Sequence, residues 1–293
     1  MKITVASGKG GTGKTTVTAS LATVWDKPVV AVDLDVEEPN LHLFLHPDIS
    51  PDIRQAWMEI PVLDQEKCNL CKECVELCQF KAISLMLSTL TVYPDMCHGC
   101  GGCLAICQQG ALTKGKRELG KIYKGQAGNI NFLSGTLRIG EAMSPPLMDA
   151  VKKEMEQLIA RQSLDAIIDA PPGVSCPALC SVLDSDVIVL VTDATPFGLH
   201  DFTLAWQSFS PLGKPMGAVI NRAGLGTDAI YKFCEQHTIP ILAEIPYDRA
   251  IAATYSQGKV IANASDELRN IFTSLQDNIR ALAVQTGKEV GHA

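Results

Sequence analysis

The stretch of sequence that decides the fold is Ser7-Gly8-Lys9-Gly10-Gly11-Thr12-Gly13-Lys14-Thr15-Thr16. It follows an apolar run typical of a buried strand, residues 2–6, and precedes residues 17–25, whose apolar side chains recur at helical spacing. Glycines let the backbone adopt positive φ and turn its N–H groups toward a phosphate, and the start of a helix adds its positive dipole end. Strand, glycine-rich loop and helix in this order predict a phosphate-binding loop. We expect nucleotide contacts from Gly8, Lys9, Gly10, Gly11, Thr12, Gly13, Lys14, Thr15 and Thr16.

Two residues of this loop have defined chemistry in such sites. Lys14 is expected to reach the β- and γ-phosphates, and the hydroxyl of Thr15 to bind Mg²⁺. The ligand predicted from this pattern is therefore ATP or ADP with Mg²⁺.

Composition narrows the class of protein. The chain has 293 residues, of which 46% are hydrophobic, enough for one large α/β domain or two domains. A net charge of -7 argues against a nucleic-acid partner bound through a broad basic face. No apolar run is as long as a membrane span and no signal-peptide pattern is present, so we expect a cytoplasmic protein without a membrane anchor. Eleven cysteines without an export signal then favour metal or redox chemistry over disulfides.

Carboxylates follow two further apolar runs. Asp33 and Asp35 end the run at residues 28–32, and Asp169 ends the run at residues 166–168. Ligands bind at the carboxyl ends of strands in parallel sheets, so these side chains are expected beside the glycine-rich loop.

A repeated cysteine pattern interrupts the alternation of strands and helices. The first copy, C-x₂-C-x₂-C-x₃-C, contains Cys68, Cys71, Cys74 and Cys78, and the second contains Cys97, Cys100, Cys103 and Cys107. Two such runs are among the strongest signals for [4Fe–4S] clusters. Zinc is the rival reading, because C-x₂-C pairs also build zinc sites.

The glycine-rich loop with its second lysine, Lys9, resembles the deviant phosphate-binding loop of the MinD/ParA family, which includes the nitrogenase iron protein. The resemblance implies that Lys9 crosses to the partner's nucleotide in an ATP-bound homodimer. It further implies that Asp35 orients the attacking water, that Asp33 and Asp169 lie near Mg²⁺, and that Gly173 senses the γ-phosphate. The catalytic residues expected on this basis are Lys9, Lys14, Asp35 and Asp169. Asn221, with Arg222 and Pro246 beside it, is expected at the adenine base.

The cysteine repeat is similar to bacterial ferredoxins that carry two [4Fe–4S] clusters. In those proteins the fourth cysteine of each run binds the other cluster. This similarity implies that one cluster is held by Cys68, Cys71, Cys74 and Cys107, and the other by Cys97, Cys100, Cys103 and Cys78.

The expected fold is a mostly parallel, doubly wound α/β sheet of the P-loop NTPase class with an inserted small α+β ferredoxin-like domain. The ATPase domain is assigned to residues 1–59 and 113–293, and the insert to residues 60–112. Residues 113–124 are expected to form a hairpin, and residues 129–139 one or two edge strands with a turn at Gly135. Amphipathic helices are expected at residues 147–161 and 266–284, and a helix is expected to begin at His200 and Asp201.

Three cysteines lie outside the repeat. Cys176, seven residues after Asp169, matches in spacing a cluster ligand of the nitrogenase iron protein, and Cys180 lies one turn further along a helix. The two are either a third cluster site or reactive thiols, or small buried hydrophobes. Cys234 is expected in the core.

The resemblance covers most of the chain and favours an ATPase whose nucleotide-dependent dimerisation gates electron transfer to a redox or metallocofactor-biosynthesis partner. The alternatives are a carrier or assembly ATPase for iron–sulfur or metal clusters, and a ParA-like switch that positions partners while its clusters are structural.

Overall fold

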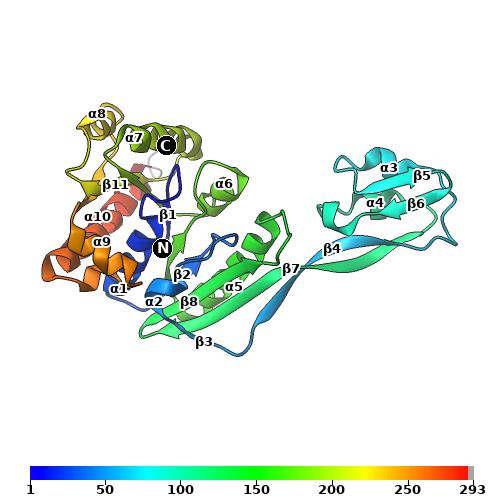
Figure 1. Ribbon diagram of the computed structural model, residues 1–293, viewed down its shortest axis with the longest axis horizontal. Coiled ribbons are helices and arrows are strands. Elements are labelled where there is room, and N and C mark those ends of the chain that lie inside the picture. Colours follow the sequence, from blue (N-terminus) through cyan, green and yellow to red (C-terminus); the bar gives the residue numbers. More distant parts are fainter. Residues whose placement is uncertain (290–293) are drawn as a thin grey trace.

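The computed structural model describes residues 1–289, and its main feature is a ten-stranded sheet with helices on both faces (Figure 1). The strand order is β12-β11-β10-β1-β9-β2-β8-β7-β3, with β4 also paired to β7. All pairings from β12 to β8 are parallel, whereas β7 runs antiparallel to its neighbours. The mostly parallel α/β sheet predicted from the sequence is therefore confirmed. Its strands are β1 (Lys2–Ala6), β2 (Val29–Asp33), β3 (Asp48–Ile49), β4 (Arg54–Leu63), β7 (Leu112–Ala127), β8 (Ile130–Leu137), β9 (Asp165–Asp169), β10 (Val187–Asp193), β11 (Met216–Ala223) and β12 (Ile241–Pro246).

Apolar residues alternate between the two faces of the central strands, so both faces need helices. Ile3 and Val5 of β1 pack toward one face and Ala6 toward the other. The first face is covered by α1 (Lys14–Val24), α2 (His42–Leu45), α9 (Arg249–Ser256) and α10 (Asp266–Glu289). The second is covered by α5 (Pro145–Gln162), α6 (Cys176–Val182), α7 (Pro196–Phe209) and α8 (Ala229–Gln236). Among residues 1–289, no helix has the length and apolar character needed to cross a bilayer.

The cysteine repeat lies in a small lobe at the far end of a two-stranded arm (Figure 1). Strands β4 and β7 form this arm, paired from Arg54 opposite Ile122 to Leu63 opposite Leu112, with a shift of register between Ala56 and Trp57. The lobe contains α3 (Glu73–Leu77), β5 (Ile83–Met86), β6 (Thr89–Val92), the 3₁₀ turn Pro94–Met96 and α4 (Gly102–Ile106). The boundaries expected at residues 60 and 112 fall inside β4 and at the start of β7.

The predicted connection between lobe and body was wrong in two places. Residues 113–124 form no hairpin but part of the single strand β7, and residues 129–139 contain β8, an interior strand between β2 and β7. Their glycines mark close approaches rather than turns: a Cβ on Gly120 would lie 2.2 Å from the carbonyl oxygen of Thr136. At Gly135 it would lie 2.8 Å from methyl groups of both Val36 and Val151.

The predicted start of the helix at His200 and Asp201 was also wrong. Helix α7 begins at Pro196, and the Thr195 hydroxyl accepts a hydrogen bond from the Gly198 amide at 3.0 Å. Thr195 is a better N-cap than His200 because the oxygen on its short side chain can accept a hydrogen bond from an amide of the first turn. The helices expected at residues 147–161 and 266–284 are confirmed as parts of α5 and α10, and Cys234 is buried as expected.

Gly135→Ala is expected to destabilise the protein by roughly 1–3 kcal/mol, because the new methyl group overpacks the contact between β8, Val36 and Val151. Urea unfolding followed by circular dichroism measures the change. Gly128→Asn is the matched control: Gly128 has positive φ and open space at its Cβ, and asparagine tolerates that conformation. Equal stability of the Gly135→Ala variant and the wild type would contradict the packing described.

Candidate functional site

The glycine-rich loop joins β1 to α1 as the sequence predicts. Gly11 and Gly13 have φ of 78° and 93°, and Lys14 is the first residue of α1. Gly8 faces α7 so closely that a Cβ there would lie 1.9 Å from the Asp201 carbonyl oxygen. Glycine is needed at these positions for backbone conformation or for space.

Asp169, at the end of β9, receives the polar groups that α1 presents to the sheet. Lys14 Nζ donates to Asp169 Oδ1 at 2.9 Å, and the Thr15 hydroxyl donates to Oδ2 at 2.7 Å. The Thr18 hydroxyl adds a contact of 3.1 Å to Oδ1. Asp169 is 1% exposed and Lys14 7%, so this is a buried ion pair whose partners depend on each other. The structure thus brings together the expected phosphate-binding lysine, the expected Mg²⁺ hydroxyl and a carboxylate.

Asp33 and Asp35 lie beside this pair at the end of β2. Asp33 is fully buried and accepts hydrogen bonds from the amides of Asp35 at 3.1 Å and Leu41 at 2.9 Å. Burial raises the pKa of Asp33 well above its usual range, and the charge of Asp169 adds to the shift. Burial also raises the pKa of Asp35 to about 6; Lys14 opposes this shift and Asp169 reinforces it.

Gly173 connects the loop after β9 to the glycine-rich loop. Its amide donates to the carbonyl oxygen of Ser7 at 2.9 Å, and its φ of 88° favours glycine. A movement of residues 170–173 would therefore be transmitted to the start of the phosphate-binding loop.

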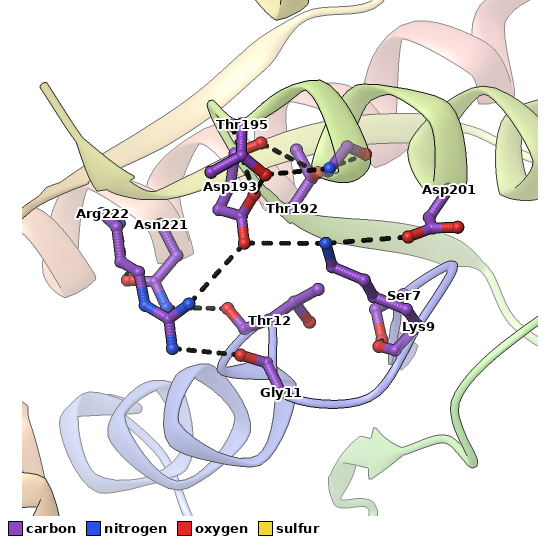
Figure 2. A network of polar contacts seen from close by, with 11 residues as sticks. Ser7, Lys9, Gly11, Thr12, Thr192, Asp193, Thr195, Asp201, Asn221 and Arg222 are labelled. Carbon is purple, nitrogen blue, oxygen red and sulfur yellow. Dashed lines mark hydrogen bonds and ion pairs between the residues drawn. The ribbon is translucent and has the colours of Figure 1, made fainter. Parts of the chain in front are cut away.

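Lys9 lies in a network of polar contacts centred on Asp193, the last residue of β10 (Figure 2). Lys9 Nζ is 3.6 Å from Asp201 Oδ2 and 3.9 Å from Asp193 Oδ2, so within one chain the lysine lies against its own α7. Asp193 Oδ2 is also 3.6 Å from Arg222, whose guanidinium donates to the Gly11 carbonyl at 3.1 Å. Asp193 accepts further hydrogen bonds from the amide and hydroxyl of Thr195.

Sequence reasoning did not assign Asp193 and Asp201 to the site. A signal for Asp193 was present: it ends an apolar strand of the parallel sheet, as Asp33 and Asp169 do. Asp201 had no such signal, because its role depends on the close packing of α7 on Gly8.

A cavity of about 220 Å³ adjoins the loop. The three residues expected at the base, Asn221, Arg222 and Pro246, all line it, together with Gly11, Gly13, Thr16, Tyr247, Asp248 and Tyr255. Asn221 Nδ2 also donates to the Thr12 carbonyl at 2.7 Å, so this side chain fixes the glycine-rich loop as well as facing the cavity.

The eight cysteines of the repeat are divided between two cavities of the lobe. One is lined by Cys68, Cys71, Cys74 and Cys107, and the other by Cys78, Cys97, Cys100 and Cys103. These are the two groups expected from the sequence, each with three cysteines of one run and the fourth of the other. Burial raises the pKa of Cys103 to about 11, and the neighbouring Cys97 and Cys100 add to the shift. Among residues 1–289, no three His, Cys, Asp or Glu side chains converge on one point as a single ion would require.

The remaining two cysteines of interest lie on α6, just after Gly173. Cys176 is the first residue of the helix and is exposed, and Cys180 is partly buried. Cys180 packs against the hydrophobic cluster of α5. The structure thus places Cys176, but not Cys180, fully at the surface.

Comparison with protein families gives one match over most of the chain. The CbiA profile, described as the CobQ/CobB/MinD/ParA nucleotide binding domain, matches residues 3–261. Two uncharacterised proteins of Methanocaldococcus jannaschii are similar along their whole length. One is 30% identical over 95% of this chain and 98% of its own, and the other is 28% identical over 94% and 96%.

Solved structures share the fold. The cell division ATPase MinD of Pyrococcus furiosus has a TM-score of 0.59 at 22% identity, covering 96% of this chain and 98% of its own. The septum site-determining protein MinD of Pyrococcus horikoshii, complexed with Mg-ADP, has a TM-score of 0.59 at 21% identity, covering 97% and 98%.

Lys14→Ala is expected to weaken Mg-ADP binding by roughly 10- to 150-fold, the cost of losing one hydrogen bond to a charged phosphate. Isothermal titration calorimetry measures the affinity. Lys9→Ala is the comparison within the same loop, because Lys9 points to α7 and not to the start of α1. Lys9→Ala should keep its ADP affinity; a similar loss in both variants would contradict the separate placement of the two lysines.

Proposed function

The chain belongs to the CobQ/CobB/MinD/ParA nucleotide-binding family, and from this premise we propose that it is an ATPase whose nucleotide state gates electron transfer from two [4Fe–4S] clusters to a partner protein or metallocofactor. The observation that carries the proposal is the arrangement of the cysteines. Each predicted four-cysteine group lines its own cavity, in a lobe built onto the edge of the nucleotide-binding sheet.

The nucleotide-binding part of the proposal uses the residues around Asp169. Lys14 pairs with Asp169 and would turn to the β- and γ-phosphates of ATP. The Thr15 hydroxyl and the carboxylates of Asp169 and Asp33 supply oxygen atoms. Mg²⁺ prefers such atoms, either as direct ligands or as acceptors for its bound water. Asp35 would then accept a proton from the attacking water, for which a pKa of about 6 is well suited near neutral pH.

The cysteine groups fit iron–sulfur clusters in donor type and number. A [4Fe–4S] cluster takes four thiolates, one at each iron, so its ligands surround a volume and need not converge on one point. Cys68, Cys71, Cys74 and Cys107 would hold one cluster, and Cys97, Cys100, Cys103 and Cys78 the other. When bound, such clusters supply one-electron transfer.

An ATP-dependent homodimer is part of the proposal. Lys9 is 29% exposed and is held only by carboxylates at 3.6 and 3.9 Å, longer than hydrogen bonds. A triphosphate in a facing subunit would offer it a stronger anion, and Lys9 would then stabilise charge that develops during phosphoryl transfer. The partner that receives electrons is a redox or metallocofactor-biosynthesis protein in the cytoplasm.

One observation favours a second function, a carrier or assembly ATPase for iron–sulfur clusters. Cys176 is exposed and lies three residues after Gly173, where a nucleotide-dependent loop would move it. A transferred cluster needs accessible, movable ligands, whereas six of the eight lobe cysteines are buried or partly buried. Release of iron to a chelator on ATP hydrolysis would identify a carrier. A ParA-like positioning switch would instead show hydrolysis that is independent of cluster redox state.

The kcat/KM for ATP hydrolysis, which reports the free enzyme, is expected to fall as the pH decreases through about 6, approaching tenfold per pH unit, because protonation of Asp35 removes the base. Asp35→Asn should lower turnover by about 10²- to 10⁴-fold and abolish this pH dependence while ATP still binds. Initial rates of phosphate release across this range measure both effects.

The control for Asp35 is Asp52→Asn, which removes an exposed carboxylate outside the loop that carries Asp35. This variant should keep the wild-type rate and profile. A wild-type profile in Asp35→Asn would assign the proton acceptor elsewhere.

Anaerobic analysis is expected to find about eight iron and about eight sulfide per chain, as two four-iron clusters require. Cys100→Ala should reduce both to about four, because it removes one ligand of one group. Cys234→Ala is the matched control, since Cys234 is a buried residue of α8, away from the lobe, and its loss should leave the iron content unchanged. Zinc in place of iron would overturn the assignment.

A further inference from the structure

A continuous set of contacts joins the loop after β2 to the second cysteine group. The loop comprises residues 34–41 and follows Asp33, which accepts hydrogen bonds from the amides of Asp35 and Leu41. Its Val36 is 1% exposed, packs on Gly135 of β8, and accepts a hydrogen bond from the Leu137 amide at 2.9 Å. The last residues of β8 therefore move with this loop.

Arg138 continues the connection from β8 to the lobe. Its amide donates to the Leu119 carbonyl at 2.8 Å, and its Nε donates to the Glu118 carbonyl at 2.9 Å, so it is fixed to β7. Its guanidinium also donates to Asp95 Oδ1 at 2.6 Å. Asp95 lies in the turn Pro94–Met96, immediately before Cys97.

Arg117 and Glu141 form the buried part of the same cluster. The Arg117 guanidinium donates to the carbonyls of Pro94 at 2.9 Å and Cys97 at 3.3 Å, and to Glu141 Oε1 at 3.2 Å. The side chains of Arg117 and Glu141 are only 6% and 1% exposed. Glu141 Oε2 also lies 3.6 Å from the Arg138 guanidinium, so the two arginines share this carboxylate.

Within residues 1–289, the first cysteine group lacks this connection. Cys97 and Cys78 belong to the hydrophobic cluster that also contains Leu34 and Val36, whereas Cys68, Cys74 and Cys107 lie in a separate cluster within the lobe, together with Cys103 of the second group. Gly99 in addition packs on β4 so closely that a Cβ there would lie 2.7 Å from Met58. Two members of the second group, Cys78 and Cys97, are thus anchored to the arm and the body, whereas the first group is anchored to the lobe.

We propose that the cluster held by Cys78, Cys97, Cys100 and Cys103 is the nucleotide-responsive one, and that Arg138 and Asp95 are positioning residues that transmit the state of residues 34–41 to Cys97. This inference rests on the proposed function and specifies which cluster is regulated and by which contacts. ATP would rearrange residues 34–41, Val36 would displace the end of β8, and the Arg138–Asp95 pair would shift the backbone that carries Cys97.

The test compares amide hydrogen exchange of the cluster-loaded protein with and without Mg-ATP. Nucleotide should change the exchange of residues 93–99 by about 5- to 150-fold, the usual range for coupling between sites, and should leave residues 68–74 unchanged. In Arg138→Ala and in Asp95→Ala the ratio should fall to near unity, and the double variant should lose nothing more, because each change alone breaks the Arg138–Asp95 contact through which the signal passes. Arg138 and Asp95 are 33% and 75% exposed, so neither change empties the core.

Lys114→Ala is the matched control: Lys114 also belongs to the arm and pairs with Glu59 at 3.0 Å, but outside this network. It should keep the wild-type response. A second measurement is the nucleotide-dependent shift in reduction potential, which should disappear in Arg138→Ala while iron content stays unchanged. The inference is overturned if Mg-ATP binds and residues 93–99 do not respond, or if both variants keep the response. Absence of Mg-ATP binding or of iron, measured separately, would instead overturn the proposed function.

Discussion

The buried pair between Lys14 and Asp169 is the constraint on which the rest of the site depends. A carboxylate that is 1% exposed is costly to bury unless it is paired and hydrogen-bonded, and Lys14, Thr15 and Thr18 all provide these contacts from one helix. This requirement fixes the start of α1 against the end of β9, and so fixes the glycine-rich loop between them. The carbonyl of Asp169 also accepts from the Leu34 amide at 2.9 Å, which ties the loop after β2 to the same residue.

The same constraint makes the site sensitive to nucleotide. Asp33 lies next to Asp169, and Lys14 is the cation that these two buried carboxylates share. Burial and the charge of Asp169 therefore raise the pKa of Asp33. A phosphate that drew Lys14 away would leave these carboxylates uncompensated unless a cation took its place. Mg²⁺ arriving with the nucleotide would be such a cation. The coupling of metal, lysine and the loops that carry Asp33 and Asp169 then follows from charge balance alone.

Sequence patterns could predict those parts of the fold that are set locally. The glycine-rich loop, the carboxylates at strand ends and the cysteine spacings depend on residues that lie close along the chain. The errors came where distant segments meet: Gly120 and Gly135 resemble turn residues, but they are glycines because Thr136, Val36 and Val151 approach them from other elements. Asp201 and Arg117 were missed for the same reason. Tertiary packing brings Asp201 close to Lys9 and brings Arg117 to the carbonyl of Cys97.

The length of the arm limits how the two ends of the molecule can influence each other. A ten-residue strand such as β4 spans about 33 Å. At that separation two charges in water interact by roughly 0.1 kcal/mol, and at physiological salt, where screening acts over about 8 Å, by less. The charge of a bound triphosphate therefore cannot act on the far end of the arm through solvent. An influence of one end on the other has to pass through packed contacts, and the register of β8 with β2 and β7 places such contacts where the arm leaves the sheet. A rigid two-stranded arm without side-chain links would hold the lobe at a fixed distance but would carry no signal. The ion pair of Arg138 with Asp95 and the hydrogen bonds of Arg117 to the carbonyls of Pro94 and Cys97 are what distinguish this arm from a simple spacer.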